Sequence, residues 1–176
     1  MSSDRIVVLE QRRELSFSFE EMLAYHGGGS PGGVAHAFKA LQRAVPLLGA
    51  GEGVQRRHVF IETAFGGPGA RDAFELVTRA VTEQRFVVDA SLARPDLGRA
   101  RERFVFRLRY RGNTITLMLR AGFVTDEFID LTRQELRNPN EERRLAVMKS
   151  AMADRVMSAD AASVYDVSSE DYPGKP

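Results

Sequence analysis

The chain has 176 residues, a formal net charge of +1 and a hydrophobic fraction of 43%, which predicts a single domain with a sizeable core. It contains no cysteine, which excludes disulfides, thiolate zinc sites and thiol catalysis. The near-zero net charge requires neither a nucleic acid nor a membrane partner. No apolar run approaches the length of about 20 residues that a transmembrane helix needs, and the first residues lack a signal-peptide pattern, so we expect a cytoplasmic protein.

The first part of the chain predicts two helices that meet at a glycine-rich loop. Ser18 followed by Glu21 is the pattern of a capping box and marks the start of the first helix. That helix ends at residues 27–29, because three consecutive glycines extend a helix poorly. Ser30 and Pro31 then begin a second helix, in which apolar residues recur at helical spacing.

The middle of the chain predicts strands. Residues 58–63 and 86–88 are expected to be strands, separated by a helix that follows the glycine cluster at 66–69. Residues 104–119 carry the strongest β pattern, since apolar and polar side chains alternate on both sides of a turn at 111–113. This pattern is typical of a hairpin with one buried face.

The last part of the chain predicts two helices, at residues 124–136 and 141–157, and a flexible tail at residues 168–176. Helices that precede and follow an antiparallel sheet predict an α+β fold with flanking helices. We therefore expect one domain over residues 1–167.

The most unusual segment is residues 25–33, where a histidine ends one helix and a glycine loop leads into the next helix. Backbone N–H groups at a helix start favour an anion or a carbonyl oxygen, and glycine lets the backbone approach a ligand. His26 could act there as an acid, a base or a metal ligand. A helix–helix corner that simply needs glycine is the alternative, and both interpretations stay open.

The second glycine cluster, at residues 66–69, matches neither a P-loop nor a dinucleotide-binding fingerprint. Asp72 follows it and either points into a site or interacts with the helix dipole. A hydrolase triad of Ser30, His26 and Asp72 is not expected, because the nucleophile-elbow context is absent and Pro31 lacks the N–H that an oxyanion hole would use.

The remaining polar candidates indicate structural roles. The three histidines, His26, His36 and His58, lack metal-ligand spacing, and His36 is expected at the edge of the core or on the surface. Arg103, Arg107 and Arg109 could form a basic sheet face for RNA, but the aromatic residues of that strand fall on the opposite face. An ion-paired or solvated face is therefore the expectation, with no nucleic-acid partner.

The sequence FSFEEMLAYHGGGSPGGVAHAF at residues 17–38 resembles the opening of the FmdE family, which takes its name from a component of formylmethanofuran dehydrogenase. That family carries an aromatic residue, then His-Gly-His, one variable residue and Cys-Pro-Gly before a helix. The matching positions here are His26, Gly27, Pro31 and Gly32, and the counterparts of the family's second block are Glu62, Thr63, Asp72, Ala73 and Thr78.

Three departures from the family pattern affect its metal site. The family's second motif histidine is Gly28 here, its motif cysteine is Ser30 and its later cysteine is Ala80. Only His26 keeps a side chain that could bind a metal, whereas a stable zinc site needs three or four ligands. The resemblance thus implies an FwdE-like α+β fold and a homodimer. It also implies a divalent metal as cofactor, but the missing cysteines weaken that expectation.

Two hypotheses for function follow. The first is a small-ligand-binding protein, which could also be an enzyme, with a cleft between residues 26–33 and 62–78. His26 and Asp72 would be its catalytic groups, His26 its only metal ligand, and its ligand-binding residues would be Gly28, Ser30, Gly32, Glu62 and Thr78. The second hypothesis is a structural or regulatory homodimer without chemistry; RNA binding is a weaker third.

Overall fold

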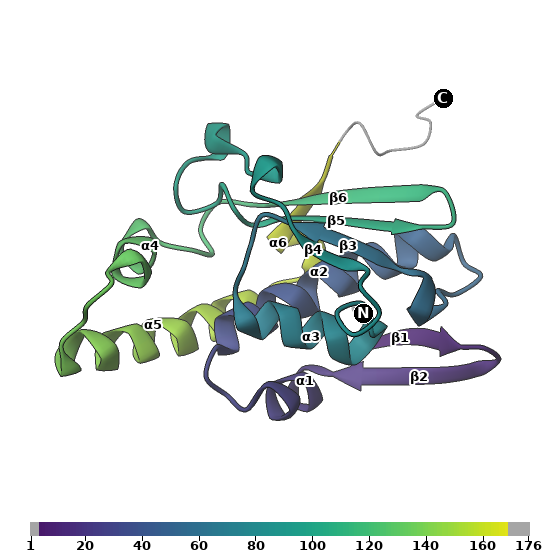
Figure 1. Ribbon diagram of the computed structural model, residues 1–176, viewed down its shortest axis with the longest axis horizontal. Helices are drawn as coiled ribbons and strands as arrows, with labels where there is room; N and C mark the ends of the chain where they lie inside the picture. The colour runs from purple at the N-terminus through teal and green to yellow at the C-terminus, as the bar shows by residue number, and fades with distance from the viewer. Residues whose placement is uncertain (1–3, 169–176) are drawn as a thin grey trace.

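The computed structural model describes residues 4–168, and it has an α+β architecture as the sequence predicts (Figure 1). The chain begins with a two-stranded antiparallel hairpin of β1 (Arg5–Glu10) and β2 (Arg13–Ser18). It continues directly into α1 (Phe19–His26). The predicted capping box is confirmed, because Ser18 accepts the N–H of Glu21 while the Glu21 carboxylate accepts the N–H of Ser18.

The main sheet has five strands in the order β4-β3-β5-β6-β7. Neighbouring strands are antiparallel except for β3 and β4, which run parallel. The expectation of an antiparallel sheet therefore needs this one correction, which arises because a helix joins β3 to β4 and brings the chain back to the same end. The strands are β3 (Phe60–Thr63), β4 (Phe86–Val88), β5 (Val105–Tyr110), β6 (Asn113–Leu119) and β7 (Tyr165–Val167).

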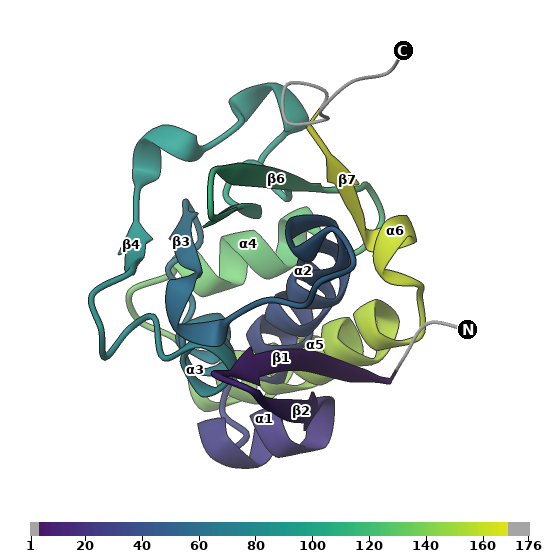
Figure 2. The ribbon, with the colours of Figure 1, turned by 90° about the vertical axis from the view of Figure 1, so that its right-hand side faces the viewer.

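The helix α2 (Pro31–Gly49) is the centre of the core. Figure 2 shows it surrounded by the sheet, the β1–β2 hairpin and the other helices. Small side chains such as Ala35, Ala37, Ala40 and Ala44 are fully buried along it, so neighbours can approach on every side. Pro46 lies inside this helix, and Ala50 ends it in the left-handed conformation.

The remaining helices cover α2 or extend beyond it. Figure 1 shows α4 and α5 projecting together from the rest of the molecule. Asn138 begins α5 with a second capping box, in which it accepts the N–H of Glu141. These helices are α3 (Pro68–Thr78), α4 (Asp126–Arg133), α5 (Pro139–Met157) and α6 (Ala161–Val164).

Several predicted boundaries are displaced. The strand predicted from residue 58 begins at Phe60, because Arg56–His58 forms a 3-10 turn. The helix predicted over residues 124–136 ends at Arg133, which leaves Leu136 91% exposed in the connection to α5. Ser168 donates its N–H to the Thr116 carbonyl, and the rest of the predicted tail, residues 169–176, lies outside the described residues.

Candidate functional site

The glycine loop between α1 and α2 has a conformation that depends on glycine. Gly27 and Gly28 have φ angles of 87° and 83°, in the left-handed region that other residues adopt only with strain. Gly27 thereby ends α1, with its N–H bonded to the Leu23 carbonyl. Ser30 is the N-cap residue of α2, yet its side chain makes no capping hydrogen bond.

The starts of α2 and α3 pack directly against each other through glycine. A Cβ atom on Gly69 would collide with the Ser30 carbonyl oxygen and lie 3.0 Å from the Val34 nitrogen. A Cβ on Gly33 would lie 3.1 Å from the Ala70 nitrogen. Gly33 and Gly69, one from each glycine cluster, therefore permit the close approach of the two helix starts, a contact that neither interpretation of the glycine loop predicted.

His26 and Asp72 meet across this contact, although 46 residues separate them in the chain. The imidazole Nδ1 lies 2.8 Å from Asp72 Oδ2. The His26 side chain is only 9% exposed and the Asp72 side chain 30%. Arg71 also approaches the Asp72 carboxylate, at 3.8 Å. The pair has the geometry in which a carboxylate accepts the Nδ1–H of an imidazole and orients the ring.

The second ring nitrogen of His26 is buried and has no hydrogen-bond partner among the described residues. Gly29 lies beside it, since a Cβ added to that glycine would lie 4.0 Å from Nε2. When Asp72 accepts the Nδ1–H of the neutral ring, Nε2 presents a lone pair. A buried lone pair without a donor costs about 1–3 kcal/mol, so this nitrogen is a position at which a ligand O–H or N–H could bind.

A cavity of about 470 Å³ lies beside the two helix starts. Its walls come from the beginnings of α2 and α3, from the sheet side through Phe65 and Phe104, and from α4 and α5. We call it the helix-start cavity. Its lining residues are Ser30, Gly32, Gly33, Phe65, Gly66, Gly67, Pro68, Gly69, Arg99, Arg103, Phe104, Phe128, Ile129, Thr132, Arg133, Lys149 and Met152.

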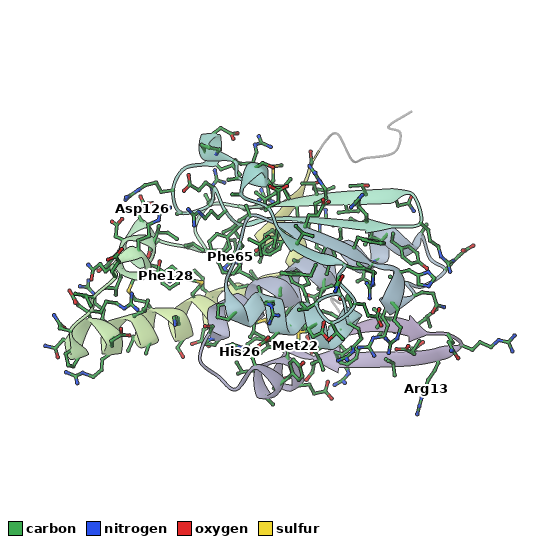
Figure 3. All side chains as sticks on the ribbon, in the orientation of Figure 1. Arg13, Met22, His26, Phe65, Asp126 and Phe128 are labelled. Atoms are coloured by element: carbon green, nitrogen blue, oxygen red, sulfur yellow. The ribbon has the colours of Figure 1, made fainter. Side chains whose placement is uncertain are left out.

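Only part of the predicted ligand-binding set lies at this cavity. Ser30 and Gly32 line it, whereas Gly28, Glu62 and Thr78 do not. Glu62 pairs instead with Arg109, at 3.3 Å on the outer face of the sheet. The Thr78 hydroxyl donates to the Phe74 carbonyl at 2.7 Å and is buried at the end of α3. In the view of Figure 3, His26 and Phe65 lie on opposite sides of the first turn of α3.

The donor set does not fit a metal ion. Within residues 4–168, no three side chains of His, Cys, Asp or Glu are close enough together to hold one. The Nδ1 atom of His26 is already bonded to Asp72, which leaves one nitrogen, and a stable site needs three or four ligands. We therefore derive no step that involves a metal.

His36 is fully buried, so the prediction of a core-edge or surface position is wrong. Its Nδ1 lies 2.7 Å from the Tyr165 hydroxyl, and its ring centroid lies 4.6 Å from that of Phe104. Burial lowers the pKa of His36 to about 3 and raises the pKa of Tyr165. Both groups are therefore neutral at physiological pH and act in the core.

The arginine face of the sheet is bonded to protein groups. Arg107 donates to the Thr116 hydroxyl at 3.3 Å, Arg109 pairs with Glu62, and Arg120 lies 3.7 Å from Asp166. Phe106 is fully buried, which confirms that the aromatic residues of this strand lie on the face opposite these arginines. Arg109 and Arg120 are therefore ion-paired, whereas Arg103 of the predicted basic face lines the helix-start cavity.

Sequence reasoning did not assign most of the cavity wall. Phe65, Phe128, Arg99, Arg133 and Lys149 line the cavity without belonging to any motif. They come from separate loops and helices, so no spacing in the sequence connects them. The one available signal in the sequence was the position of Phe65 directly before the second glycine cluster, which could have placed its side chain next to that loop.

Comparison with known proteins adds no assignment. No protein-family model matches the chain, and a search of curated proteins found no match. The FmdE resemblance therefore stays a prediction. Among residues 4–168, no helix is both long enough and apolar enough to span a membrane.

Proposed function

We propose that this chain binds a small organic molecule in the helix-start cavity, which follows the loop that holds His26, and that it is a divergent relative of the FmdE family. The observation that carries the proposal is the cavity that Ser30 and Gly32 line at the two helix starts, and a role for His26 rests on the geometry of its ring. Asp72 holds Nδ1 at 2.8 Å, and Nε2 is buried without a partner among the described residues.

The chemistry of this pair is that of an acid–base group. A carboxylate at Nδ1 favours the tautomer with a free lone pair at Nε2. Gly29 places no side chain beside Nε2, and the next residue, Ser30, lines the cavity. His26 does not line the cavity and its Nε2 is buried, so a ligand bound at Ser30 would donate a hydrogen bond to His26 only when residues 27–29 move aside.

The test is native mass spectrometry of gently purified protein, compared with the same sample after denaturation. We expect a small mass that is retained in the native spectrum and lost on denaturation, and also lost in His26→Gln. His58→Gln is the matched control, because His58 is exposed and lies in the 3-10 turn before β3. Equal retention by wild type and His26→Gln would count against His26, and no retained mass in any sample would count against the proposal.

A second candidate is a homodimer without chemistry, in a cytoplasmic setting as the composition suggests. It is favoured by two exposed apolar side chains, Leu136 in the connection between α4 and α5, which is 91% exposed, and Val147 on α5, which is 68% exposed. Light scattering after size exclusion would give the mass of a dimer, and Leu136→Asp would convert it to a monomer. A monomeric wild-type protein at micromolar concentration would remove this candidate.

A further inference from the structure

We infer that the ligand of the helix-start cavity is an organic anion with a flat, apolar body. The inference rests on the proposed function for the location of the ligand, and it adds the chemical class. It depends on three features of the cavity wall: the sign of its charge, its backbone donors and its aromatic rings.

The charged side chains that line the cavity all have the same sign. Four are cationic, Arg99, Arg103, Arg133 and Lys149, and none of the lining residues is acidic. Arg99 pairs with Asp130 at 2.8 Å and Arg133 with Glu102 at 2.9 Å. These two positive charges are therefore balanced by carboxylates outside the cavity.

The other two cations have no such balance. Within residues 4–168, neither Arg103 nor Lys149 has a carboxylate within ion-pair distance, and the Lys149 ammonium donates to the Gly29 carbonyl at 3.3 Å. The cavity thus carries about two uncompensated positive charges. An anionic group on the ligand would pair with them, whereas a cationic ligand would be repelled.

The backbone at the cavity adds donors of the same polarity. Gly32, Gly33 and Gly69 lie in the first turns of α2 and α3 and line the cavity. The first N–H groups of a helix have no acceptor within their own helix. Neither N-cap side chain supplies one, because Ser30 makes no capping bond and Gly67 has no side chain. Both helix dipoles therefore favour negative charge at the same wall.

The opposite part of the wall is apolar and flat. Phe65 stacks on Phe104, with ring centroids 4.5 Å apart and an interplanar angle of 25°. Phe128 on α4 lines the same cavity, together with Ile129 and Met152, and Figure 3 labels Phe65 and Phe128, which come from different parts of the fold. A planar ligand would stack between these rings, and about 470 Å³ is within the usual size of small-molecule sites.

A ligand needs both a negative charge and a flat apolar body to match the wall of the helix-start cavity. Inorganic phosphate alone would leave the aromatic surface uncovered, and a neutral aromatic compound would leave Arg103 and Lys149 unpaired. The structure favours a ligand in which both parts are joined, with the anion at the helix starts and Arg103 and the ring toward Phe128.

The test uses 1-naphthyl phosphate, 1-naphthoate, 1-naphthol and inorganic phosphate as probes. Because the chain has no tryptophan, the naphthyl fluorescence can be followed without competing indole emission. We expect saturable binding of at least one naphthyl anion, about tenfold tighter than 1-naphthol and weakened by added salt. The tighter of the two anions identifies the headgroup as a phosphate or a carboxylate.

The variants assign the binding to this cavity. Arg103→Gln should weaken the anion about tenfold, the loss expected for one charged hydrogen bond, and leave 1-naphthol unchanged. Arg13→Gln is the matched control, because Arg13 is exposed on β2 at the far end of the molecule (Figure 3). Phe128→Ala should weaken all naphthyl probes alike, and thermal unfolding of each variant checks that it is folded.

Two results would overturn this inference. One is binding of 1-naphthol as tight as that of the naphthyl anions, and the other is an affinity for the anions that Arg103→Gln leaves unchanged. Either result would reject the anion class while a mass retained in native spectra and lost in His26→Gln still supported the proposed function. No saturable binding of any probe would also overturn it.

Discussion

Two regions of this molecule hold a histidine in almost the same way, with different consequences. His26, at the end of α1, and His36, inside α2, each place Nδ1 within 2.8 Å of an oxygen. In both rings Nε2 is buried without a partner among the described residues. The partner of His26 is the partly exposed carboxylate of Asp72, and the partner of His36 is the buried hydroxyl of Tyr165.

The difference in partner decides what each ring can do. The carboxylate of Asp72 orients the His26 ring through Nδ1, whereas the buried hydroxyl of Tyr165 does little to offset the loss of water around His36. His36 is therefore held neutral, with its pKa lowered to about 3 by burial. His26 lies beside the Asp72 carboxylate and the glycine loop. The same ring atoms therefore serve packing in the His36 region and lie next to the loop before α2 in the His26 region.

The largest expected effect concerns His36 and is the decrease in the free energy of unfolding as the pH falls. The unfolded chain takes up a proton at His36 near pH 6.5, whereas the folded chain does so only near pH 3. Since the unfolded state binds more protons between these values, the stabilisation is complete above pH 6.5 and is lost as the pH falls. We expect the free energy of unfolding to decrease by about 1.4 kcal/mol per pH unit from this group.

Urea unfolding between pH 6.5 and pH 5 measures this slope before most carboxylates titrate. In His36→Gln the slope should flatten by about 1.4 kcal/mol per pH unit, whatever the absolute stability of the variant. His58→Gln provides the control, because that ring is exposed. An unchanged slope in His36→Gln would mean that His36 is not held neutral by burial.

A smaller effect tests the His26 region. Asp72→Asn replaces the carboxylate by an amide that can donate as well as accept, so the preference for the Nδ1–H tautomer of His26 should decrease. Because Asp72 is partly exposed, we expect the free energy of unfolding to change by less than about 1 kcal/mol. Long-range proton–nitrogen correlation spectra of the histidine rings report the tautomer directly.

In the wild type, the neutral ring of His26 should carry its proton on Nδ1, and the Nε2–H form should increase in Asp72→Asn. The His36 signals should stay unchanged, which makes that ring an internal control. A wild-type ring protonated mainly on Nε2 would contradict the role given to Asp72 and remove the main support for an acid–base group.

Local patterns predicted the elements whose signals lie within a few residues. The Ser18 capping box and the alternation in residues 104–119 are both present in the structure. The β1–β2 hairpin had no such signal, since its turn contains Gln11, which adopts a φ of 57° without being glycine or asparagine. The parallel β3–β4 pair and the addition of β7 to the sheet depend on contacts distant in sequence.

The candidate site, like the fold, was predictable from the sequence only where its signals are local. The sequence suggested that His26 and Asp72 could meet, but only the packing of α1 against α3 fixes their distance. Glu62 follows Ile61 in β3, and because successive strand residues face opposite sides, it points away from the core. Thr78 turns back to the Phe74 carbonyl, a local bond that competes with any outward role.

The smallest expected effect is that of Ser30→Ala, which separates the stability of the α2 start from ligand binding there and is compared with Asn138→Ala as a reference. Asn138 accepts the N–H of Glu141 in the capping box of α5, so Asn138→Ala should lower the free energy of unfolding by about 1 kcal/mol. Ser30 makes no capping bond at the start of α2, so Ser30→Ala should change it by less than about 0.5 kcal/mol. Urea midpoints of the two variants give both values.

A loss of about 1 kcal/mol in Ser30→Ala would show that the hydroxyl caps α2 in solution. In that case the N–H groups at this helix start would already be partly satisfied, and the cavity would attract an anion less. If stability is unchanged while the binding of a naphthyl anion weakens, the hydroxyl and the helix start are available to a ligand. The His26 region would then differ from the His36 region in having polar groups that a ligand can reach, whereas His36 is enclosed in the core.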